Sequence, residues 1–65
     1  MLRGRNLRRG DEILVAGLWR IVQSLEPVDN VDYRLAWFTD GSRTLVHVRE
    51  LFELRMTHIL GEEVA

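Results

Sequence analysis

Short apolar segments, each closed by a turn signal, fill the middle of this chain and constrain its fold more than any other feature. Gly10-Asp11 opens the first segment, Ala16-Gly17 separates the first two, and Asp40-Gly41 closes the third. Glycine-containing turns between short alternating segments are typical of β-hairpins. The pattern predicts an all-β fold, a small antiparallel barrel built from hairpins.

The alternation of apolar residues predicts five strands. They are Asp11–Val15, Leu18–Glu26, Tyr33–Phe38, Arg43–Val48 and a last strand near Phe52–Met56. In the second strand Gln23 interrupts the apolar face, and a β-bulge there would shift the alternation once. We expect residues 49–51 to form one short turn before the last strand. The alternative is a C-terminal helix, because residues 51–60 also fit a helical stripe that Gly61 could cap.

Composition excludes several classes of protein. The chain has 65 residues, enough for one domain with a thin core, so self-association could help to stabilise it. It has no cysteine, which excludes disulfides and thiolate metal sites and favours a cytoplasmic location. No apolar run approaches the roughly 20 residues of a membrane span. The N-terminus is basic but lacks the apolar stretch of a secretory signal.

Positive charge is concentrated at the N-terminus. Residues 1–9 carry Arg3, Arg5, Arg8 and Arg9 without an acidic residue, whereas the remainder has five arginines and ten acidic residues. Guanidinium groups suit phosphates, and basic N-terminal arms bind nucleic acid. We expect residues 1–9 to form a flexible arm or to pair loosely with a sheet edge. Residues 10–56 would form the barrel, and 57–65 a tail or short helix. A solubilising or partner-binding tail is the alternative role for the arm.

The inventory of catalytic groups is poor. His47 is expected on a strand surface and His58 in the tail, and two histidines are too few for a convincing zinc site. The five glycines are scattered, so there is no phosphate-cradling loop. The neighbouring carboxylates are expected in solvated turns or strand ends, namely Asp11 with Glu12, Glu50 with Glu53, and Glu62 with Glu63. The sequence predicts no enzyme activity, no metal and no cofactor.

Aromatic residues are interpreted as core filling, Trp19 and Trp37 foremost. The opposite strand faces are also apolar, and they would line the other side of the barrel or form an exposed patch. These second-face residues are Val22, Ala36, Phe38 and Leu45.

The order of several short motifs resembles small SH3-like barrel domains of short bacterial and phage proteins. The motifs are Gly10-Asp11, Gly17-x-Trp19, Trp37-Phe38-Thr39-Asp40-Gly41 and Glu50-Leu51-Phe52-Glu53-Leu54. The resemblance covers about residues 7–56. It implies five short strands with a one-turn 3₁₀ helix before the last, in modules that bind nucleic acids or proteins. It transfers no residue roles.

Two binding functions follow from these features. In the first, the protein is a module that associates with nucleic acid, either DNA or RNA. Its contact surface would consist of arginines together with an aromatic residue of the sheet. Its predicted contact residues are Arg3, Arg5, Arg8, Arg9, Arg20 and Arg34. In the second, the apolar second face and the edge strands bind a protein partner, as in a small phage or bacterial regulator that occupies a host protein. A homo-oligomer is the third alternative.

Overall fold

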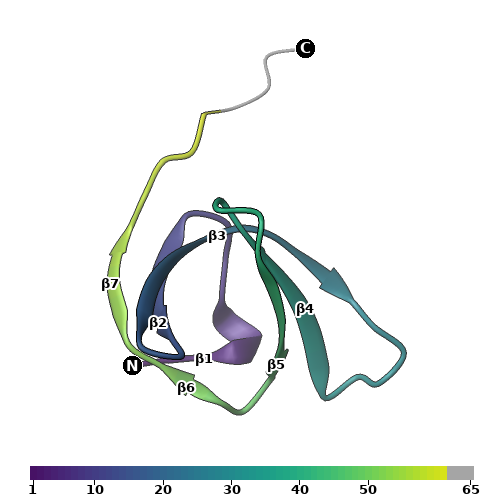
Figure 1. Cartoon of the computed structure of the whole chain (residues 1–65). Helices are drawn as coiled ribbons and strands as arrows, with labels where there is room; N and C mark the ends of the chain where they lie inside the picture. The colour runs from purple at the N-terminus through teal and green to yellow at the C-terminus, as the bar shows by residue number, and fades with distance from the viewer. Residues whose placement is uncertain (62–65) are drawn as a thin grey trace.

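The computed structural model describes residues 1–61, and all but one of their regular elements are β-strands (Figure 1). In chain order the elements are β1 (Leu2–Arg3), the 3₁₀ turn η1 (Gly4–Asn6), β2 (Asp11–Val15), β3 (Leu18–Pro27), β4 (Tyr33–Phe38), β5 (Arg43–His47), β6 (Leu51–Phe52) and β7 (Leu54–Thr57). The prediction of an all-β fold is confirmed.

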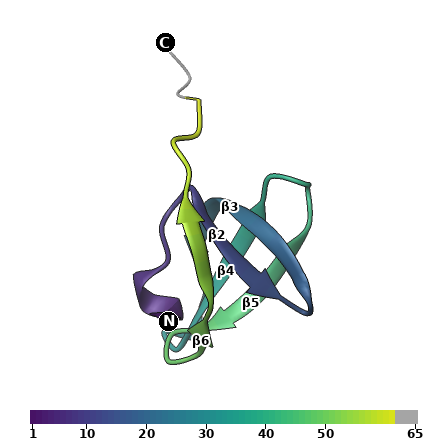
Figure 2. The ribbon, with the colours of Figure 1, turned by 90° about the vertical axis from the view of Figure 1, so that its left-hand side faces the viewer.

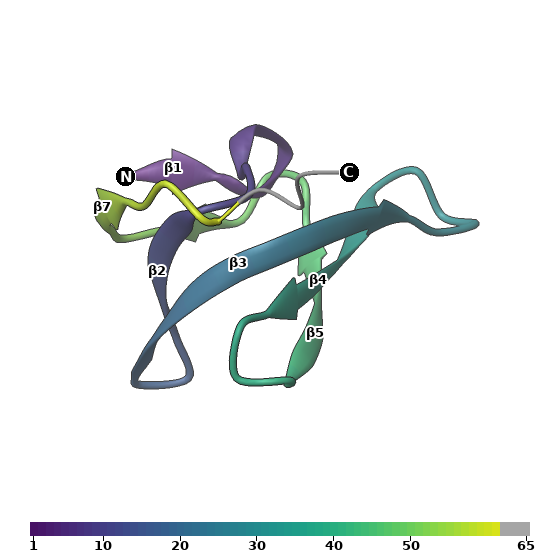
Figure 3. The same ribbon diagram turned by 90° about the horizontal axis from the view of Figure 1, so that it is seen from above.

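The strands form two sheets. Five of them make an antiparallel sheet in the order β5-β4-β3-β2-β7, and β1 pairs with β6 in a separate two-stranded sheet. The large sheet curls around the core, and β3 runs across the molecule when it is seen from above (Figures 1 and 3). Its hydrogen-bonded order begins at β5 and ends at β7, so the sheet is open and differs from the closed five-stranded barrel that we expected.

A β-bulge in β3 lies where the sequence predicts it. Val22 pairs with Phe38 and Ser24 pairs with Trp37, which leaves Gln23 as the extra residue. Val22 before the bulge is fully buried, and Leu25 after it packs against the core. The bulge therefore changes the inward positions of β3 from even to odd numbers, and this prediction is confirmed.

The core contains three of the four residues that we placed on the second face, Val22, Ala36 and Phe38. Its buried apolar residues are Leu7, Ile13, Val22, Ala36, Phe38, Val46 and Phe52. The expectation that Trp19 and Trp37 fill the core is wrong, since Trp19 is 40% exposed and Trp37 is only half-buried. Leu45 also lies outside, because it pairs with the outward residue Leu35 across β4 and β5. The aromatic rings of the core are those of Phe38 and Phe52, whereas the two indoles lie toward the outer face.

The first nine residues are packed against the sheets over part of their length. β1 pairs with β6, with Leu2 opposite Phe52. The Gly4 N–H donates to the Glu50 carbonyl at 2.8 Å, and Leu7 is a buried core residue. We expected this segment to be a flexible arm or to pair loosely with a sheet edge. In the structure its first strand pairs with β6, so residues 1–9 do not form a free arm.

The chain between β5 and β7 corrects a second expectation. After β5, the Glu50 N–H donates to the His47 carbonyl at 3.0 Å, which makes a tight turn too short for a 3₁₀ helix. The 3₁₀ turn of the described residues is η1, near the N-terminus. Strands β6 and β7 follow the tight turn, so the alternative helix over residues 51–60 does not form.

The chain leaves the sheets after β7 (Figure 2). The His58 N–H donates to the Gly10 carbonyl at 2.7 Å, and residues 58–61 have no regular structure. Residues 62–65 of the predicted tail lie outside the described residues. None of the described segments forms a helix with the length and apolar character needed to cross a membrane.

Gly4 lies where η1 approaches the backbone after β5, and a larger residue should not fit. A Cβ atom at Gly4 would overlap the backbone carbonyl of His47, whereas a Cβ at Gly61 would meet nothing. We expect Gly4→Ala to lower the free energy of unfolding by about 1–3 kcal/mol. Gly61→Ala should change it by less than about 0.5 kcal/mol. Urea denaturation checks both values, and equal midpoints for the two variants would contradict this packing.

Candidate nucleic-acid interface

The four arginines of the N-terminal segment surround η1 with exposed side chains. Arg3 ends β1, Arg5 is the middle residue of η1, and Arg8 and Arg9 precede β2. The Arg9 guanidinium donates to the Gly61 carbonyl at 3.1 Å. The pairing of β1 and the bonds of η1 therefore hold the backbone of a short segment with four arginines, which we call the arginine turn (Arg3, Arg5, Arg8 and Arg9).

Arg34 has a different role from the one that we predicted. It lies on β4, and its Nη1 donates to the carbonyls of Gly4 at 2.9 Å, Arg5 at 3.2 Å and Leu7 at 3.2 Å. These bonds give a charged donor to carbonyls of η1 and of the residue that follows it, and of these only the Gly4 carbonyl also accepts a bond within the turn, from the Leu7 N–H. Arg34 thus fastens the arginine turn to β4, and Nη1 is directed toward the protein.

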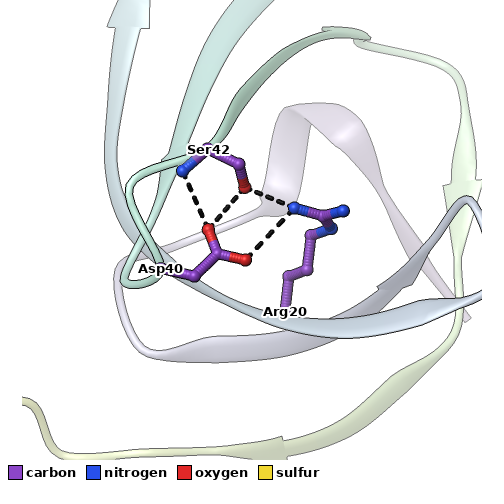
Figure 4. Close-up of polar contacts among 3 residues, drawn as sticks. All are labelled: Arg20, Asp40 and Ser42. Carbon is purple, nitrogen blue, oxygen red and sulfur yellow. Dashed lines mark hydrogen bonds and ion pairs between the residues drawn. The ribbon is translucent and has the colours of Figure 1, made fainter.

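Arg20 is also bound within the protein. Figure 4 shows its guanidinium beside Asp40 and Ser42, in the loop between β4 and β5. Nη1 donates to the Asp40 carboxylate at 3.2 Å and to the Ser42 hydroxyl. The guanidinium carbon lies 5.8 Å from the centroid of the Phe38 ring, so this cation covers one end of the core.

The predicted surface joining Arg20 and Arg34 does not form. Their strands β3 and β4 are neighbours, but Arg34 pairs with Pro27 at the far end of β3 from Arg20. The register between β3 and β4 thus keeps Arg20 and Arg34 apart, although their strands are neighbours.

Asp40 has an altered ionisation. The Ser42 hydroxyl and the Ser42 N–H both donate to its carboxylate, and the Arg20 cation lies beside it. These interactions lower the pKa of Asp40, with the hydroxyl bond as the largest cause. Asp40 is exposed and serves to close the hairpin loop.

The outer face of β4 and β5 carries an aromatic ladder, defined by its three cross-strand pairs. They are Tyr33 with His47, Leu35 with Leu45, and Trp37 with Arg43. The Tyr33 and His47 rings meet edge to face, with centroids 5.0 Å apart and planes at 84°. The Arg43 guanidinium lies 5.1 Å from the Trp37 ring centroid. Alternation groups the odd residues of β4 on one face, but we expected that face in the core, so this surface was not predicted.

A hollow of about 400 Å³ lies where the arginine turn meets the aromatic ladder. We call it the turn hollow, and its lining includes Arg5, Leu25, Val28, Val31, Tyr33 and Arg34. Val28 and Val31 belong to the loop between β3 and β4, which projects from one side of the molecule in Figure 3. The hollow combines apolar walls with one aromatic ring, two cations and the carboxylate of Glu26.

Asp11 is a buried carboxylate rather than a solvated one. Its oxygens accept hydrogen bonds from the Arg8 N–H at 2.9 Å and the Thr57 hydroxyl at 2.8 Å. Only 4% of the residue is exposed, beside a second hollow of about 350 Å³ that Asn6 and Leu54 also line. Asp11 therefore connects the arginine turn to β7, and the expectation that it is solvated is wrong.

The remaining polar groups offer little for metal binding. Glu12 Oε1 lies 2.9 Å from His58 Nε2. Its other carboxylate oxygen, Oε2, forms an ion pair with Arg55 Nη1 at 3.7 Å. Within residues 1–61, no three side chains of the metal-ligating types cluster closely enough to hold an ion. Glu62 and Glu63, expected to be solvated, lie outside this range.

Comparisons with protein-family models, with curated proteins and with solved structures found no match to this chain. The resemblance to SH3-like domains accordingly stays a prediction.

Removing the Arg34 side chain should loosen the arginine turn. Arg34→Ala leaves three carbonyls without their charged donor, so we expect the free energy of unfolding to fall by about 1.5–3 kcal/mol. Arg43→Ala removes an exposed stacking cation and should cost less than about 1 kcal/mol. Urea denaturation gives both values. Hydrogen exchange at the Leu7 amide, which donates to the Gly4 carbonyl, should accelerate in Arg34→Ala alone.

The Ser42 hydroxyl should hold the pKa of Asp40 below its ordinary value. Because the folded pKa is lowered, the stabilisation is present above the unfolded pKa and disappears as the pH falls through the folded pKa. Ser42→Ala should raise the pKa of Asp40 toward its ordinary value, as measured by NMR titration of the carboxyl carbon. Ser24→Ala is the matched control, and an Asp40 titration unchanged by Ser42→Ala would refute the assignment.

Proposed function

We propose that this chain is a non-catalytic, SH3-like module that binds single-stranded nucleic acid. Phosphates would contact the arginine turn, and bases would lie along the aromatic ladder. One observation supports this most strongly: Arg5 and Tyr33 line the same hollow, so one cation of the arginine turn adjoins one exposed ring. Fold-level resemblance to SH3-like domains and the antiparallel order of five strands add support.

The chemistry of the two surfaces suits an unpaired strand. Guanidinium groups bind phosphates, and aromatic rings stack on bases regardless of sequence. The base faces of a duplex are stacked on one another, so the aromatic ladder can stack only on the bases of a single strand. We assign no nucleic-acid contact to Arg20 or Arg34, because they are partly buried and their guanidinium groups bind the protein itself, whereas the residues of the arginine turn are exposed.

The charge of the whole chain limits the interface to one side. Ten acidic residues outweigh the nine arginines, so a strand would be attracted only where the arginine turn concentrates positive charge. A cytoplasmic location and a homo-oligomer both stay predictions, the former based on the absence of cysteine.

Protein binding is the second candidate function. On the outer side of β2, β3 and β7, Trp19 is 40% exposed and Met56 is 51% exposed. Within residues 1–61, β7 pairs with β2 alone, so its other edge could accept a strand from a partner.

Fluorescence anisotropy across a salt series distinguishes the two candidates. We expect micromolar affinity for single-stranded RNA or DNA, weaker binding of duplex, and a steep decline between 50 and 300 mM salt. Deleting residues 1–9 is unsuitable, because Leu7 belongs to the core. Replacing all four residues of the arginine turn by Gln preserves the backbone bonds of η1. This variant should bind more weakly, with a salt slope reduced by about 0.7 for each phosphate that it no longer neutralises.

Arg55→Gln is the control, because Arg55 lies on β7 beside Trp19. It should leave affinity and slope unchanged. Absence of binding at 50 mM salt would reject the nucleic-acid function and leave the protein-binding candidate.

A further inference from the structure

We propose that the turn hollow holds one nucleotide of the bound strand, with its base against Tyr33 and its phosphate on Arg5. This inference rests on the proposed function and extends it, because phosphate contacts alone require no cavity. It assigns the hollow a ligand class, an unpaired nucleotide in RNA or DNA.

The size of the turn hollow suits one nucleotide. Its volume of about 400 Å³ lies within the range of roughly 300–1,000 Å³ that is usual for small-molecule sites. It lies near the lower end of that range, which is too small for a folded nucleic-acid strand. Leu25, Val28 and Val31 provide apolar contacts for the faces and edges of a base. The second hollow has no aromatic ring in its lining, so it lacks this complementarity.

The charges around the turn hollow favour an anion. Arg5 and Arg34 contribute two cations, and a guanidinium stays charged at any ordinary pH. Glu26 also lines the hollow, but its carboxylate accepts a hydrogen bond from the Trp37 indole at 3.1 Å. Two cations outweigh one carboxylate in this lining, so a nucleotide phosphate would meet a net positive charge.

Arg5 is arranged to reach a ligand without losing its place in the fold. Its N–H donates to the Val48 carbonyl at 3.0 Å, and its carbonyl accepts from Arg34 at 3.2 Å. The backbone is thus held on both sides while the side chain remains exposed. Such an arrangement reduces the ordering cost of binding.

Tyr33 is similarly preorganised. Its edge-to-face contact with His47 orients the ring, yet 37% of the residue remains exposed. A ring that is already oriented loses little conformational freedom when a base stacks on it. Tyr33 is therefore the residue on which the base-dependent part of the affinity should depend.

The test compares two oligonucleotides with the same phosphates. Anisotropy is measured for a labelled eight-nucleotide uridine strand and for a strand of equal length with abasic positions. The wild-type protein should bind the base-containing strand more tightly, and stacking of one base on Tyr33 should contribute a factor of roughly 5 to 100 to this ratio. Tyr33→Ala should lower the ratio by that factor and leave affinity for the abasic strand unchanged.

Two further variants control for damage to the fold. Tyr33→Phe keeps the ring and should retain the base preference, whereas Trp19→Ala removes an exposed indole elsewhere and should not alter it. Equal binding of both strands by the wild type would overturn the nucleotide site while the nucleic-acid function stands. A base preference that is undiminished in Tyr33→Ala, with a native NMR spectrum, would also overturn it. Binding of neither strand would reject the site together with the proposed function.

Discussion

The attachment of the N-terminal turn by Arg34 is the interaction on which the rest of the structure depends. One guanidinium nitrogen on β4 donates to three carbonyls of residues 4–7. This brings Leu7 into the core and places Arg5 beside the loop between β3 and β4. The backbone bonds of η1 to the chain between β5 and β6 complete this attachment. The segment that contains most of the exposed positive charge is therefore also a structural element of the domain.

The arginines divide by role. Arg20 and Arg34 lie partly buried and bind acceptors inside the protein, where a planar group with several donors can satisfy more than one oxygen. The arginine turn keeps its side chains at the surface. Cations near the core thus stabilise the fold, and those on η1 and its neighbours supply the proposed contacts. Counting arginines in the sequence cannot make this distinction.

Local features of the fold could be predicted from the sequence, and non-local ones could not. Turn residues and alternation predicted the hairpins, and the interruption at Gln23 predicted the bulge. Alternation separates two faces of a strand without saying which one is inside, so the indoles were placed in the core. The structure buries the opposite face instead, where Val22, Ala36 and Phe38 join the core.

The candidate site was predictable only in its cations. Arg34 finds its acceptors about 30 residues earlier in the chain, and Asp11 finds Thr57 46 residues later. No local pattern indicates such partners. The aromatic ladder also depends on the register between β4 and β5, which brings Tyr33 opposite His47.

The position of Arg5 on η1 couples ligand occupancy to the integrity of the N-terminus. The backbone bonds that hold η1 also place Arg5 in the lining of the turn hollow, so undocking of residues 4–7 would remove that cation from it. A molecule that fills it selects the docked form and suppresses local opening. The apparent affinity for such a ligand then depends on the fraction of molecules in which residues 4–7 are docked. A substitution far from the hollow that lowers this fraction would weaken binding in proportion.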